Sequence, residues 1–171
     1  MLRKGANKLG NQTNLDACLL LGARYIECYS IQNNPDWFGE GFVTIPEERK
    51  VKRTQKYRWI RLSDKGKSII PYFLDNNVKL PEKPQAWRMS LIRWAEAGGL
   101  DPVGISPRTL RKTWESWLAV CFGEYIHIIA ESQGHTAVTA FKHYQNTPFS
   151  DDDIRDMKVW VSGWNPRKVD V

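Results

Sequence analysis

The feature that most constrains the fold is a helix that the sequence predicts after Ser106. Serine followed by Pro107 is a strong helix start, because the serine can cap free amides and proline's fixed φ suits the first turn. The apolar side chains that follow are spaced to lie along one helix face, and they are Leu110, Trp114, Trp117, Leu118 and Cys121. We therefore expect this stripe to be buried in the core of a globular domain.

Two arginines lie outside that stripe. Arg108 and Arg111 are three residues apart and share one helix face, where their guanidinium groups can grip a phosphate with paired hydrogen bonds. Charges opposite an apolar stripe are more often simply solvated, so the pair alone does not decide the function. The net charge of +6, from 25 Lys+Arg against 19 Asp+Glu, is typical of a protein that binds a polyanion.

The composition favours one domain with a sizeable core and no metal site. The chain has 171 residues, of which 42% are hydrophobic, and it contains eight tryptophans. Cys18, Cys28 and Cys121 are far apart in the sequence and lack the spacing of metal ligands, so neither a zinc site nor a disulfide framework is expected. No stretch approaches the roughly 18 apolar residues of a membrane span, and we expect no membrane association.

The N-terminal part predicts a flexible end and then two helices. Residues 1–13 are basic and polar without apolar periodicity, so they are predicted to be a flexible end. Asn14 is predicted to cap a helix that runs to about Leu21. Gly22 then breaks the helix, and Arg24 begins a second helical stretch directly after that turn.

The central part predicts a small antiparallel sheet. Residues 42–46 and 57–62 have the β-branched and aromatic composition of strands, and the strongly basic segment 49–58 lies between or within them. Residues 64–84 are rich in turn formers and are predicted to be irregular. Together with the helices, these strands predict an α+β fold that is mainly α-helical.

The remaining helices follow from apolar spacing and helix-end signals. The apolar positions from Trp87 to Ala95 indicate a structural helix that stops at Gly98. A further helix is predicted over residues 124–132, another over 136–146 after a turn, and a last one that Ser150 caps. The three aspartates that follow this serine suit the positive end of a helix dipole.

Five elements of this chain occur in the order and spacing of one enzyme family. They are Leu21-Gly22-Ala23-Arg24, the basic strand region, Arg108-Thr109-Leu110-Arg111, Gly134-His135 and Tyr144. With them the chain resembles the catalytic domain of the tyrosine recombinases, the phage-integrase family. The resemblance implies that fold over residues 14–148, with a C-terminal helix and tail over 149–171. The tail resembles archaeal members, including the integrases of archaeal viruses and plasmids.

The resemblance implies DNA cleavage and rejoining for integration or excision. Arg24 and Arg111 would hold the nonbridging oxygens of the scissile phosphate, where fixed positive charge stabilises the transition state. Tyr144 would attack in line, giving a 3′-phosphotyrosyl bond and a free 5′-hydroxyl, and a hydroxyl of a second strand would reverse the step. His135 would contact the phosphate or assist the tyrosine. The ester conserves the bond energy, so no cofactor is expected.

The family also uses a lysine on a β-hairpin as the acid that protonates the departing 5′-oxygen. Lys52 is the preferred candidate here, and Lys50 and Lys56 are alternatives. Arg108 stands where most relatives have a histidine. An arginine remains protonated, so it can bind the phosphate but cannot transfer a proton at neutral pH. We therefore expect Arg108 to be a phosphate ligand, and proton transfer to depend on Lys52 and His135.

The partner implied by the resemblance is double-stranded DNA that carries attachment-type sites. Four protomers are expected around two duplexes, and the domain alone is expected to be a monomer. Family members usually carry an N-terminal core-binding domain as well, so this chain resembles a catalytic-domain fragment. The expected location is the cytoplasm of a host cell, in association with the nucleoid.

Two other functions fit parts of the pattern. Residues 124–146 have the helix, glycine turn and helix of a helix-turn-helix DNA reader without catalysis, in which Thr136, Thr139 and Lys142 would face DNA. A type IB topoisomerase uses a similar tyrosine and arginine set to relax DNA. Tyr144 taken alone would be an ordinary core tyrosine, and its covalent attachment to DNA would exclude both that interpretation and the non-catalytic one.

Overall fold

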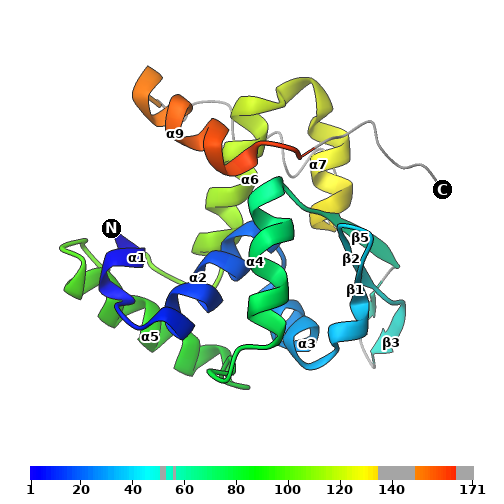
Figure 1. Ribbon diagram of the computed structural model, residues 1–171, viewed down its shortest axis with the longest axis horizontal. Coiled ribbons are helices and arrows are strands. Elements are labelled where there is room, and N and C mark those ends of the chain that lie inside the picture. The colour runs from blue at the N-terminus through cyan, green and yellow to red at the C-terminus, as the bar shows by residue number, and fades with distance from the viewer. Residues whose placement is uncertain (51–52, 56, 135–148, 165–171) are drawn as a thin grey trace.

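The computed structural model describes residues 1–50, 53–55, 57–134 and 149–164 (Figure 1). The helices are α1 (Leu2–Gly5), α2 (Leu9–Leu21), α3 (Tyr25–Asn33), α4 (Asp64–Leu74), α5 (Pro84–Ala97), α6 (Thr109–Cys121), α7 (Ile126–Gln133) and α9 (Asp151–Val161), with 3-10 turns η1 (Pro35–Trp37) and η2 (Gly123–Tyr125). The strands are β1 (Phe38–Gly39), β2 (Phe42–Ile45), β3 (Glu48–Lys50), β4 (Arg53–Gln55) and β5 (Arg58–Arg61). The protein is mainly helical with a small antiparallel sheet, as the sequence predicts.

Helix α2 is the centre of the molecule. All of residues 14–21 are buried, which is the pattern of a helix enclosed on every side. Figure 1 shows α2 and α4 between α1 and α5 on one side and the sheet on the other, with α6, α7 and α9 above them. Gly22 ends α2 in the left-handed conformation at φ 56°. This confirms the predicted break, which places Arg24 at the start of α3.

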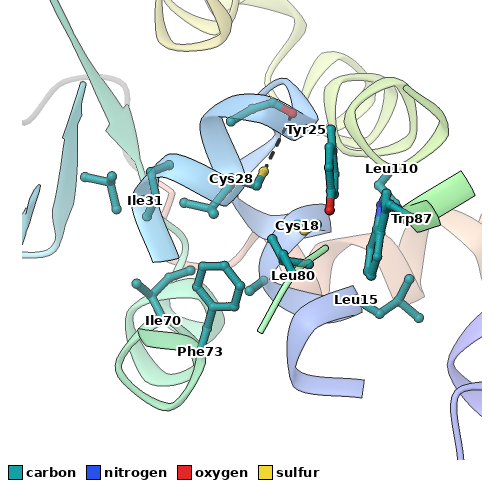
Figure 2. Close-up of a cluster of buried hydrophobic side chains, with 14 of the residues drawn as sticks. Leu15, Cys18, Tyr25, Cys28, Ile31, Ile70, Phe73, Leu80, Trp87 and Leu110 are labelled. Atoms are coloured by element: carbon teal, nitrogen blue, oxygen red, sulfur yellow. Dashed lines mark hydrogen bonds between the residues drawn. The ribbon is translucent and has the colours of Figure 1, made fainter. Parts of the chain in front are cut away.

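Two apolar clusters meet at α2. The larger one joins α2, α3, α4 and α5 to the sheet, and Figure 2 shows its stacked Tyr25 and Trp87 rings, whose centroids are 5.6 Å apart. The second gathers Leu19 and Leu20 of α2 with the buried side chains of α6, α7 and α9. Leu110, Trp114 and Leu118 of the predicted apolar stripe of α6 are buried, and Trp117 and Cys121 are half-buried. The predicted start at Ser106 was wrong, because Arg108 is the N-cap and the helix begins at Thr109.

The sheet has the strand order β1-β2-β5 and is antiparallel. Val43 pairs with Ile60 and Ile45 pairs with Arg58, so the inward-facing positions of β2 and β5 lie side by side. Strands β3 and β4 form a separate antiparallel pair, which lies between β2 and β5 in the sequence but outside the three-stranded sheet. The predicted strands over 42–46 and 57–62 are therefore confirmed, with one residue trimmed from the first and two from the second.

The N-terminal end differs from the prediction. Residues 1–13 do not form a flexible end, because α1 and the first part of α2 occupy them. Ala6 is fully buried, and Gly5 lies so close to α5 that an added Cβ would be 1.9 Å from the Trp94 carbonyl oxygen. Asn14 is buried within α2 instead of capping it, and its side chain donates a hydrogen bond of 2.8 Å to the Val78 carbonyl.

Helix α4 also differs from the prediction, because residues 64–84 were expected to be irregular. The hydroxyl of Ser63 caps α4 by accepting a hydrogen bond of 3.2 Å from the amide of Gly66. Pro71 cannot donate a backbone hydrogen bond and is unfavourable within a helix. Burial of Ile70 and Phe73 compensates for it, since both side chains are fully enclosed in the larger cluster.

Helix α9 begins where the sequence predicts. The Ser150 hydroxyl accepts a hydrogen bond from the Asp153 amide, and the Asp153 carboxylate accepts one from the Ser150 amide. The helix packs against α6 and α4, and Met157, Val161 and Trp164 are buried. The described part of the predicted C-terminal segment therefore belongs to the second apolar cluster.

Candidate functional site

The candidate site begins with Arg24, which the turn at Gly22 places at the N-terminus of α3. Its backbone amide donates to Glu27 Oε2 at 2.7 Å, and its Nη1 donates to Glu27 Oε1 at 3.0 Å. Its Nη2 donates to the carbonyl oxygen of Gly134 at 3.1 Å, at the end of α7. The Arg24 side chain is 52% exposed, so an external ligand can approach it.

Glu27 is the buried counterpart of two arginines. Its side chain is only 4% exposed, and its Oε2 also accepts a hydrogen bond of 2.8 Å from Arg58 Nη2. Burial alone would raise the pKa of Glu27. The hydrogen bond and charge of Arg58, together with those of Arg24, outweigh burial and hold the pKa below its ordinary value. Glu27 is therefore an anion at neutral pH and fixes both guanidinium groups.

Arg58 is a functional candidate that the sequence analysis missed. It is the first residue of β5, and its side chain is 8% exposed. Besides the bond to Glu27, its Nε donates to the Ser132 carbonyl oxygen at 3.3 Å. The available signal was periodicity, since Arg58 occupies the same strand face as the buried Ile60. In the sequence it belongs to the basic segment 49–58, which hides this signal.

Gly134 brings the end of α7 into this cluster. It is left-handed at φ 73°, as expected for the predicted turn, and its carbonyl oxygen accepts the bond from Arg24. An added Cβ would lie 2.9 Å from Cζ of Arg58, so only a glycine fits against that guanidinium without displacement. The next residue in the sequence is His135, which lies outside the described residues.

Arg111 of α6 belongs to the same electrostatic cluster. Burial lowers the pKa of Arg111 below its ordinary value, and the positive charge of Arg24 adds to this effect. The carboxylates of Glu115 and Glu27 act in the opposite direction. An arginine nevertheless stays protonated at neutral pH. The Nη1 atom of Arg111 is buried and has no hydrogen-bond partner within the described part of the chain.

Arg108 stands at the N-cap of α6, one helical turn before Arg111. It is exposed, and its backbone amide donates to the Ser106 hydroxyl at 3.3 Å. The pair therefore lies at the N-terminal end of α6, where the positive end of the helix dipole adds to the attraction for an anion.

Several predicted site residues cannot be placed in this geometry. Lys52, Lys56, His135 and Tyr144 lie outside the described residues, as do the residues Thr136, Thr139 and Lys142 of the helix-turn-helix alternative. Lys50 is the last residue of β3, where it pairs with Arg53. Of the six predicted catalytic residues, the structure places Arg24 and Arg111 within electrostatic range of each other and places Arg108 at the N-cap of the helix that carries Arg111.

The cluster has the properties of an anion-binding site. The Arg58 guanidinium already donates hydrogen bonds to Glu27 and Ser132. By contrast, Arg24 is half exposed, and Arg111 has a buried donor without a partner among the described residues. A buried donor of this kind is costly unless a ligand or water satisfies it. A phosphate accepts hydrogen bonds from guanidinium groups and neutralises part of their charge.

Comparison with protein-family models, with curated proteins and with solved structures finds no match to this chain. Within the described ranges, no helix has the length and apolar character needed to cross a membrane. The same residues contain no group of three or more His, Cys, Asp or Glu side chains that could hold a metal ion.

Proposed function

We propose that this chain is the catalytic domain of a tyrosine recombinase, an integrase that cleaves and rejoins double-stranded DNA. The observation that supports the proposal is that Arg24, at the start of α3, and Arg111, of α6, lie within electrostatic range of each other around the buried Glu27. Gly134, which immediately precedes His135 in the sequence, contacts Arg24 directly. Three parts of the sequence pattern thus contribute to one location, which a solvated charge pattern would not require.

In the proposed reaction, Arg24 and Arg111 bind the nonbridging oxygens of the scissile phosphate, and Arg108 supplies a further phosphate contact. Their fixed charges stabilise the negative charge that accumulates in the transition state. The Tyr144 oxygen forms a bond to phosphorus as the bond to the 5′-oxygen breaks. Lys52, with Lys50 and Lys56 as alternatives, gives its proton to that leaving oxygen.

The products of this step are a 3′-phosphotyrosyl bond and a free 5′-hydroxyl. His135 is proposed to hydrogen-bond the phosphate or to help remove the phenol proton, because the phenol has an ordinary pKa of about 10. Attack by the 5′-hydroxyl of a second strand reverses the chemistry and completes integration or excision. The proposed assembly has four protomers around two attachment-type duplexes in the host cytoplasm.

The proposal is tested by covalent capture. The protein and its Tyr144→Phe variant are incubated with a pool of nicked duplexes of randomised sequence, and adducts that survive denaturation are separated by electrophoresis. We expect an adduct with the unmodified chain and none with the variant, because only the phenol can form the ester. Tyr125→Phe, a change to a half-buried tyrosine outside the predicted site, is the matched control and should retain the adduct.

The same experiment separates the alternatives. DNA binding without any adduct would contradict the proposal and favour a helix-turn-helix module. An adduct accompanied by relaxation of supercoiled plasmid, without strand exchange between duplexes, would favour a topoisomerase. Mass spectrometry of the digested adduct identifies the attached residue, and attachment at a residue other than Tyr144 would exclude the proposed nucleophile.

A further inference from the structure

Arg58 connects three separate elements through its guanidinium group. It lies at the start of β5 and reaches Glu27 of α3 at 2.8 Å and the Ser132 carbonyl of α7 at 3.3 Å. The neighbouring turn at Gly134 leaves no room for a Cβ against the same guanidinium. Arg58 therefore contacts both of the groups that hydrogen-bond the Arg24 side chain, which are the Glu27 carboxylate and the segment that ends at Gly134.

These contacts form a closed network that links Arg24, Glu27, Arg58 and Gly134. Glu27 Oε2 accepts from Arg58 Nη2 and from the Arg24 amide, while Glu27 Oε1 accepts from Arg24 Nη1. Arg24 Nη2 then returns to the Gly134 carbonyl, which the packing against Arg58 holds in place. The direction of the Arg24 side chain consequently depends on two partners that Arg58 fixes at the same time.

The strand itself strengthens the connection between β5 and α7. The backbone amide of Arg61 donates to the Ser132 hydroxyl at 3.2 Å, so Ser132 is bound to β5 through both its side chain and its carbonyl. Strand β5 directly follows the β3–β4 hairpin and the candidate lysines. Arg58 therefore joins the strand that follows the candidate acid to the helix end that precedes His135.

A purely structural role explains this arrangement less well. Burying an ion pair is expensive, and apolar residues of similar volume often stabilise a core as well or better. Arg58 is 8% exposed and lies on a strand face that is otherwise apolar, beside Ile60 and opposite Ile45. The charge of Arg58 instead holds the Glu27 carboxylate in place and, through Glu27, the exposed Arg24.

We propose that Arg58 is a positioning residue for DNA cleavage, which holds Arg24 in the orientation that binds the scissile phosphate. This inference rests on the proposed recombinase function. Arg58 itself does not touch the phosphate in this scheme. It acts through Glu27 and Gly134, and the expected consequence is control of the rate of the chemical step with little effect on overall DNA affinity.

The first test compares Arg58→Met and Arg58→Lys with a matched control, Arg61→Met. Arg61 lies on the same strand and is equally buried, but no described hydrogen bond joins its side chain to the cluster. In Arg58→Met we expect the maximal rate of adduct formation to fall about 10- to 100-fold, the loss typical of a small misplacement of a reacting group. Affinity for DNA should change by less than about twofold, because most of it comes from other phosphate contacts.

Arg58→Lys keeps the charge but loses the fork that reaches two partners, so it should recover only part of the rate. Arg61→Met should leave the rate unchanged. In a double variant, Arg58→Met with Glu27→Gln, adduct formation should be no slower than in the slower of the two single variants. Both residues act on Arg24 through the same network, so their effects should not add. An unchanged rate in folded Arg58→Met, or equal rate losses in Arg58→Met and Arg61→Met, would overturn the positioning role.

The second test does not depend on DNA cleavage. The side-chain Nε–H signals of Arg24 and Arg111 are followed by NMR while inorganic phosphate is added to the unmodified chain and to each variant. We expect about tenfold weaker phosphate binding in Arg58→Met, again from misplacement of a ligand group, and unchanged binding in Arg61→Met. Equal phosphate binding in all variants would overturn the positioning role even if adducts form.

The two tests separate failure of this inference from failure of the recombinase proposal. If no variant and no unmodified protein forms an adduct, the recombinase function is rejected, and the phosphate titration still decides whether Arg58 positions Arg24. Thermal unfolding is measured for every variant. If Arg58→Met and Arg58→Lys both fail to fold while Arg61→Met folds, Arg58 is a structural ion-pair partner and the positioning role is rejected.

Discussion

At the scale of single residues, Gly134 satisfies a backbone constraint and a packing constraint at once. Its φ of 73° lies in the left-handed region that disfavours other residues, and an added Cβ would meet Cζ of the buried Arg58 at 2.9 Å. Gly99 has nearly the same φ, 76°, but nothing lies within 4 Å of an added Cβ. A comparison of the two glycines therefore distinguishes the effect of backbone strain from the effect of close contact with Arg58.

We expect Gly134→Ala to destabilise the protein more than Gly99→Ala does. Backbone strain alone should lower the free energy of unfolding by about 1 kcal/mol in each variant. Gly134→Ala should lose about 1–3 kcal/mol more, because Arg58 is hydrogen-bonded and cannot move away without breaking its bonds. Urea denaturation measures both values. Equal losses would show that the close approach of Gly134 to Arg58 does not constrain the fold.

Residues also differ in how much the sequence reveals about them. The resemblance to a family motif selects Arg24 and Arg111, through Leu21-Gly22-Ala23-Arg24 and Arg108-Thr109-Leu110-Arg111. The role of Arg58 depends on its ion pair with Glu27, a residue 31 positions away in the sequence. No local pattern predicts such a pairing, although a charge at an inward-facing strand position indicates that a buried partner must exist.

At the scale of elements, helices with clear ends and apolar stripes were predictable, whereas two others were not. Helix α6 has both signals, and α9 has a capping box at Ser150. Helix α1 has neither, because it is a single turn that packs against α5 with Gly5 close to the Trp94 carbonyl. Helix α4 contains Pro71, which is unfavourable within a helix, but tertiary burial outweighs that local preference.

The capping box of α9 gives a prediction at this scale. Ser150→Ala removes the acceptor of the Asp153 amide, so we expect the free energy of unfolding to fall by about 1 kcal/mol. Ser162→Ala, at the exposed other end of α9, is the matched control and should change it by less than about 0.5 kcal/mol. Chemical denaturation compares the two. A loss of equal size in Ser162→Ala would mean that the cap contributes nothing specific.

At the scale of the whole molecule, the arginine cluster belongs to a chain with a net charge of +6. Binding to DNA should therefore release counterions, and affinity should fall steeply as salt concentration rises. Each side chain that contacts a phosphate contributes its own share of this dependence of affinity on salt concentration. The exposed Arg24 should contribute, because it is half accessible and lies within electrostatic range of Arg111, whose Nη1 has no hydrogen-bond partner among the described residues.

We expect Arg24→Gln to reduce the slope of log affinity against log salt by about 1, as the loss of one phosphate contact requires. Lys4→Gln is the matched control, because Lys4 lies on α1, at the other end of the molecule from the sheet (Figure 1). It removes the same unit of charge from the chain and should leave the slope unchanged if binding is local. Fluorescence anisotropy with a labelled duplex, recorded over a salt series, measures both slopes. If both variants lower the slope equally, the attraction belongs to the net charge of the molecule and the cluster is not the place where DNA phosphate binds.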